Sequence, residues 1–194
     1  MLKMPNMIKM PKMIKIPKFF HDILGEESHV ISLFLIAGVT AVIMGWLALT
    51  EGDVFIQNGR IKGAIGFLLL MDIIAGTVAN FTKGTNDYYA ARPANRWVFI
   101  TVHIQPILIA WLLGFPLKSA VFIWGFTILS VSLVNVLKGT IHQRVVAGTL
   151  MSLGIFLSLI LYKDGSMVML LMSIFFVIKV IYSFGVDHER GGLV

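Results

Sequence analysis

The sequence contains no cysteine and unusually little charge. The absence of cysteine from all 194 residues excludes disulfides, thiolate metal ligands and cysteine nucleophiles. Charged residues make up 13% of the chain, about half the share found in soluble domains, while 57% of the residues are hydrophobic. In water such a chain would expose a large apolar surface, so we expect lipid to cover it.

Motifs for several chemistries are also missing. The sequence has no phosphate-binding loop ending in Lys-Ser or Lys-Thr, no His-Glu-x-x-His and no Gly-x-Ser-x-Gly. We expect no metal site, and nothing indicates a cofactor. Only His103 lies well inside an apolar run, so a haem held by two histidines within a bilayer is poorly supported.

Six apolar runs, each near the ~20 residues needed to cross the hydrocarbon of a bilayer, follow a short leader. These runs predict an all-α, polytopic integral membrane protein with about six transmembrane helices in a compact bundle over residues 29–186. A short tail, residues 187–194, follows the bundle. The predicted spans are Val30–Leu49, Lys62–Phe81, Trp97–Phe115, Ser119–Lys138, Val145–Tyr162 and Ser166–Gly185.

The leader, residues 1–28, contains three tandem hexads in which Pro5, Pro11 and Pro17 recur every six residues. Proline at this spacing prevents a regular helix. Lysines that alternate with Met, Ile and Phe would suit an extended strip lying on anionic lipid headgroups. The alternative is a disordered basic leader that only fixes the orientation of the chain.

The net charge of +6 is explained better by membrane topology than by nucleic acid, because basic and aromatic residues do not alternate on a soluble face. We therefore expect no nucleic-acid partner. With the N-terminus inside, 12 of the 16 Lys and Arg residues lie on the inner side and 4 on the outer side. The positive-inside rule then predicts a plasma-membrane protein with both termini in the cytoplasm.

Asp72 is the one acidic residue inside a predicted span. It precedes Phe81 by nine residues, which places it ~13 Å from the inner boundary, close to the bilayer centre. A charge at that depth costs at least ~2.5–3.5 kcal/mol, so the carboxyl group must be paired, protonated or hydrated. The pattern favours a proton, cation or ligand site, and the alternative is an acid that joins two helices.

Other polar residues are predicted at similar depth. Asn80 shares a helix face with Asp72, and Pro106 predicts a kink beside His103 and Gln105 in the third span. An Asp72–His103 contact is feasible because the second and third spans are consecutive and antiparallel.

Residues from later spans reach the same level. Asn135 comes from the fourth span, and Lys179 from the sixth either extends to the surface, which is the cheaper choice, or pairs with Asp72. We expect a polar cavity open to the cytoplasm and lined by Asp72, Asn80, His103, Gln105, Asn135 and Lys179.

The segment from Thr82 to Arg96 is the densest polar loop predicted between spans. Lys83, Arg92 and Arg96 could together bind a phosphate or a carboxylate. The alternative is an ordinary loop whose positive charges only set the topology.

The leading hypothesis is a membrane protein that binds or transports a polar solute, an ion or a proton, with Asp72 handling the charge and His103 the proton. A small polar ligand is then the expected partner besides the lipid bilayer. One alternative is a membrane enzyme acting on a lipid or isoprenoid headgroup, with His103 or Asp72 as acid or base. A second alternative is a non-catalytic accessory subunit. The substrate, the energy coupling and the oligomeric state are left open.

Overall fold

The computed structural model describes residues 12–188, which contain six helical spans long enough and apolar enough to cross a membrane. The chain forms a compact helical bundle, as the apolar runs predict. The spans are α2 (Val30–Thr50), α3 (Arg60–Ala79), α5 (Pro93–Val102) with α6 (Gln105–Leu113), α7 (Leu117–Val136), α8 (Gln143–Tyr162), and α9 (Met167–Val177) with the π-helical segment η3 (Ile178–Phe184).

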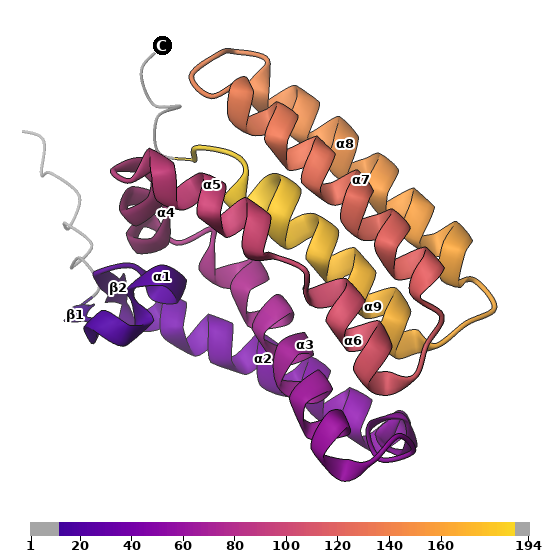
Figure 1. Ribbon diagram of the computed structural model, residues 1–194. Helices are drawn as coiled ribbons and strands as arrows, with labels where there is room; N and C mark the ends of the chain where they lie inside the picture. Colours follow the sequence, from indigo (N-terminus) through magenta and orange to yellow (C-terminus); the bar gives the residue numbers. More distant parts are fainter. Residues whose placement is uncertain (1–11, 189–194) are drawn as a thin grey trace, which may run out of the picture.

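The last span forms the centre of the bundle. Together, α9 and η3 are the most buried of the six spans in the described part of the chain. They pack against α3, α7 and α8, whereas α2 packs against α3 at the periphery (Figure 1). The outer surfaces of the helices remain apolar: Val42 and Leu49 on α2 and Leu129 on α7 are each more than 70% exposed.

The segment from Thr82 to Arg96 is mostly helical, which corrects the prediction of a loop. Thr82 caps the short helix α4 (Lys83–Ala90), because its side-chain oxygen accepts a hydrogen bond from the backbone N–H of Thr85. Pro93 then starts α5, four residues before the predicted span, since proline suits the first turn of a helix. Hydropathy alone missed α4 and the first turn of α5 because these residues are polar.

Residues 12–29, which comprise the described part of the leader and the first residue after it, fold against the end of the bundle where α4 and α5 lie (Figure 1). They contain β1 (Met13–Lys15), the 3-10 turn Lys18–Phe20, α1 (His21–Leu24) and β2 (Glu27–His29), with β1 and β2 pairing antiparallel. Lys12, Lys15 and Lys18 are exposed beside Phe19 and Phe20. The first hexad and the first half of the second, with Pro5 and Pro11, lie outside the described residues.

Candidate functional site

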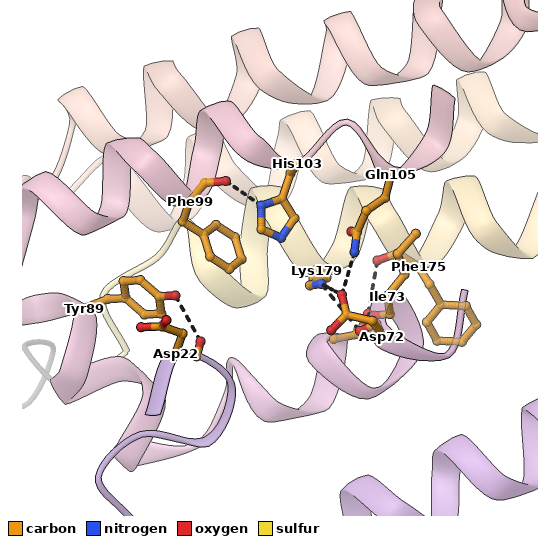
Figure 2. A network of polar contacts seen from close by, with 10 residues as sticks. Asp22, Asp72, Ile73, Tyr89, Phe99, His103, Gln105, Phe175 and Lys179 are labelled. Carbon is orange, nitrogen blue, oxygen red and sulfur yellow. Dashed lines mark hydrogen bonds and ion pairs between the residues drawn. The ribbon is translucent and has the colours of Figure 1, made fainter. Parts of the chain in front are cut away.

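The third span is broken in its middle. Helix α5 ends at Val102, His103 leaves the helical conformation with ψ 63°, and α6 begins at Gln105. Pro106 has no N–H to donate, so it fits the first turn of α6 and would have weakened a continuous helix. The sequence predicted a kink here, and the interruption turns both His103 and Gln105 toward α3 (Figure 2).

An ion pair between α3 and η3 lies opposite this break. Lys179 Nζ lies 2.8 Å from Asp72 Oδ2, and Gln105 Nε2 donates to the same oxygen at 2.6 Å (Figure 2). The Lys179 side chain is only 4% exposed, whereas that of Asp72 is 38% exposed. Lys179 therefore turns inward to a counterion rather than outward to the surface, and three spans meet at one carboxylate.

Gly76 makes this inward path possible. A Cβ atom at position 76 would lie 2.5 Å from Cε of Lys179, so a larger residue would force the end of the lysine side chain to shift. The π-helical turn η3 contributes as well, because its wider backbone sets the direction in which Lys179 leaves the last span. The glycine and the wide turn together position the ammonium group.

His103 occupies the same region but does not touch Asp72. Its Nδ1 hydrogen-bonds the backbone carbonyl of Phe99, and its ring packs on the Phe99 ring with centroids 3.7 Å apart. A carbonyl only accepts, so Nδ1 must carry the proton, and Nε2 of the neutral ring is then an acceptor. Figure 2 shows this second nitrogen directed toward Lys179 and Asp72.

A cavity of about 420 Å³ lies between α3, α5, η3 and α1. Two residues that line the cavity carry a buried amide atom, Nδ2 of Asn80 and Oε1 of Gln105, that has no hydrogen-bond partner within residues 12–188. Buried polar atoms are normally paired, so an unpaired donor and an unpaired acceptor on two side chains of one cavity wall favour a bound polar molecule or water beside them. The polar residues that line the cavity are Asp22, Asp72, Asn80, Tyr89, Asn95, His103, Gln105 and Lys179.

Five of the six residues predicted for the polar cavity meet there, and Asn135 does not. Asn135 Oδ1 accepts a hydrogen bond from Arg96 Nε at 3.1 Å, away from the cavity lining. Arg96 is 2% exposed and also donates to the carbonyls of Phe184 and Gly185 at 3.1 and 3.0 Å. Arg96, held by Asn135, thus satisfies backbone carbonyls at the end of the last span.

The three cations of the predicted anion loop are not brought together. Lys83 pairs with Asp87 at 2.7 Å and Arg92 pairs with Glu26 at 2.7 Å, both at the surface. Arg96 points into the bundle. Binding of one anion by all three residues therefore finds no geometric support.

The cavity also contains residues that the sequence did not point to. Asp22 and Ile23 reach it because α1 docks on α4: Tyr89 Oη donates to the carbonyl of Asp22 and Thr85 Oγ1 to that of Ile23, both at 3.0 Å. Burial is the main cause that raises the pKa of Tyr89 above its ordinary value, so this hydroxyl stays a donor at neutral pH. No local signal in residues 12–29 foretells such a long-range contact.

Comparisons with protein-family models, with curated proteins and with solved structures found no match for this chain. The function is therefore argued from the geometry of the cavity.

Proposed function

We propose that this chain is a multi-pass membrane protein of the plasma membrane, with six transmembrane spans and both termini in the cytoplasm. The apolar side chains exposed along α2 and α7 support insertion, since lipid would cover them. Arg96 and Lys179 are buried in the bundle and should not count as topology signals. Removing these two from the twelve inner cations leaves ten against four, which still favours this orientation.

Reporter fusions test the orientation. A reporter that is active only outside the cytoplasm should be silent when it is fused to either terminus, and active when inserted at Asp164 between α8 and α9. Activity at either terminus would mean that the orientation is inverted or the number of spans is odd.

The proposed function is the binding or transport of a small polar solute in the cavity between α3, α5 and η3. The observation that carries this proposal is the unpaired Asn80 Nδ2 and Gln105 Oε1 beside the Lys179–Asp72 pair. A solute with both a hydrogen-bond acceptor and a donor would satisfy the two amide atoms. Its volume fits, because solute sites in proteins commonly enclose about 300–1,000 Å³.

The cavity has polar access from one end only. Asn95, at the exposed start of α5, marks that end, and the ion pair forms the floor. Beyond the floor, α3 and α6 are closed by fully buried apolar residues, Leu70, Ile109 and Leu113. A solute would therefore enter from the predicted cytoplasmic side, and transport would require the broken span α5–α6 to move against α3.

A second candidate is an enzyme that removes a proton from its bound substrate. The observation in its favour is Nε2 of His103, an acceptor directed toward the cavity while Nδ1 is fixed by the Phe99 carbonyl. A chemically altered product would distinguish this candidate from binding or transport.

Thiol labelling tests whether the cavity is accessible to water. The chain has no cysteine, so a single introduced thiol is the one reactive group of its kind. Val102→Cys places it on the cavity wall, and Val42→Cys, in the middle of α2, is a matched control that is exposed but outside the cavity. Reaction needs the thiolate, which forms in water and not in hydrocarbon. In lipid nanodiscs, Val102→Cys should therefore react with N-ethylmaleimide about tenfold faster than the control variant. Equal rates for the two variants would remove the support for a solute site.

A further inference from the structure

The cavity is open along its side as well as at its end. Val98 and Val102, four residues apart on one face of α5, both line it and are 58% and 59% exposed. Side chains that line the cavity and are this exposed lie at its lateral rim, between the hydrated interior of the cavity and the hydrocarbon outside the bundle. The same opening leaves the Asp72 side chain 38% exposed, although its partner Lys179 is buried.

The end of the cavity is narrowed by the leader. Asp22 and Ile23 of α1 lie across it, held by hydrogen bonds from Tyr89 and Thr85. The backbones of Gly25 and Gly84 are in close contact behind them, with no room for a side chain on either residue. With the end partly covered by α1, the side along α5 offers a second route to the ion pair.

Polar side chains of the cavity lining form a row, here called the track, that runs along this side opening. Asn95 lies at the start of α5 and His103 just after its end, eight residues later, so the track descends ~12 Å along the helix. Asn80, His103, Gln105 and the ion pair continue it inward, while Val98 and Val102 keep its outer edge apolar. One side of the opening thus suits a polar headgroup and the other an alkyl chain.

The charges on the wall restrict the headgroup. The lining carries two carboxylates, Asp22 and Asp72, and one ammonium group, Lys179, so the fixed charge disfavours an anion. The unpaired Asn80 Nδ2 needs an acceptor and the unpaired Gln105 Oε1 needs a donor. Hydroxyl and amide groups supply both without a net charge.

We propose that the occupant of the cavity is a membrane amphiphile whose uncharged hydroxyl- or amide-bearing head enters sideways between α3 and α5, while its alkyl chain remains in the lipid against Val98 and Val102. This assignment rests on the proposed function and narrows its solute to a lipid-like molecule. The break in the third span extends the polar lining deep into the cavity, because it turns the side chains of His103 and Gln105 toward the head of the amphiphile. A continuous apolar helix would offer no polar group at this depth.

Protection of a single thiol tests this assignment. In phosphatidylcholine nanodiscs, Val102→Cys is labelled with N-ethylmaleimide in the presence of 1-oleoylglycerol, glycerol or oleate. 1-Oleoylglycerol has an uncharged hydroxyl head, glycerol is that head without the chain, and oleate has the same chain with an anionic head. We expect 1-oleoylglycerol at saturation to slow labelling about tenfold, and glycerol and oleate to change it less than about twofold. Protection should be lost in Val102→Cys combined with Gln105→Leu, which removes the acceptor together with the hydrogen bond to Asp72 and keeps the side opening.

The outcomes separate the two proposals. Equal protection by glycerol would identify a water-soluble occupant, which overturns the amphiphile and leaves the proposed function standing. Equal protection by oleate, or no protection by any of the three, would also overturn the amphiphile. If Val102→Cys reacts no faster than Val42→Cys before any addition, the proposed function itself fails.

Discussion

Asp72→Asn should destabilise the protein much more than Lys179→Met, although both substitutions break the same ion pair. The asymmetry follows from burial: the Lys179 side chain is 4% exposed and that of Asp72 is 38% exposed. Without Asp72, the lysine ammonium stays buried with no counterion, and breaking a buried pair in this way costs about 3–5 kcal/mol. For a protein of this size the unfolding temperature should fall by about 10 °C.

Lys179→Met should cost less, about 1–2 kcal/mol, because the remaining carboxylate keeps the hydrogen bond from Gln105 and can be hydrated from the cavity. Methionine is unbranched and flexible, so it can follow the lysine path past Gly76. The double variant Asp72→Asn with Lys179→Met buries no unpaired charge. It should therefore recover most of the stability lost in Asp72→Asn alone.

Thermal unfolding of the four proteins in one detergent measures this cycle. Each should first be shown to elute as a single species, so that unfolding is compared between folded proteins. If Asp72→Asn unfolds at the same temperature as the unmodified chain, the ion pair does not contribute to the stability of the fold. If Lys179→Met is the more damaging single change, the burial argument is wrong.

Much of the bundle follows directly from the sequence. Apolar runs of span length predicted six helices, and each predicted boundary lies within four residues of the observed one. The prediction works because a span is specified by its length and apolar composition, which are local properties. It failed between Thr82 and Arg96, because the helices there begin with polar turns whose capping residues hydropathy does not register.

The sequence predicted the depth of the site residues along their spans but not the direction of their side chains. Counting residues from the span ends placed Asp72, His103 and Gln105 at one level, and the structure brings all three to one cavity. The inward turn of Lys179 could not be predicted, since it depends on the π-helical segment and on the space left by Gly76. Asn135 was placed at a suitable depth, but rotation of α7 directs it to Arg96 instead.

Gly84→Ala is expected to detach residues 12–29 from the end of the bundle without unfolding the six spans. A Cβ atom at Gly84 would collide with the backbone carbonyl of Glu27, and a backbone atom cannot swing away as a side chain can. The opposite residue, Gly25, has φ +73°, so it also resists adjustment. The contact should therefore open as a unit, because the leader joins the spans through few contacts.

Two measurements follow the detachment. Trypsin should cleave after Lys15 and Lys18 at least about tenfold faster in Gly84→Ala than in the unmodified chain, while the unfolding temperature changes little. Gly45→Ala is the matched control: it lies on α2 with nothing within 4 Å of the added Cβ, so the leader should keep its resistance. That control should be slightly more stable, by about 0.5–1 kcal/mol, because alanine favours a helix over glycine.

The same variant tests what the leader does for the cavity. When Asp22 and Ile23 leave, the covered end opens to water, and Val102→Cys should react faster with N-ethylmaleimide in the Gly84→Ala background. Faster proteolysis with unchanged thiol labelling would mean that α1 docks on α4 without covering the cavity. Unchanged proteolysis would instead contradict the tight Gly25–Gly84 contact, and with it the argument that docking of α1 partly covers the end of the cavity.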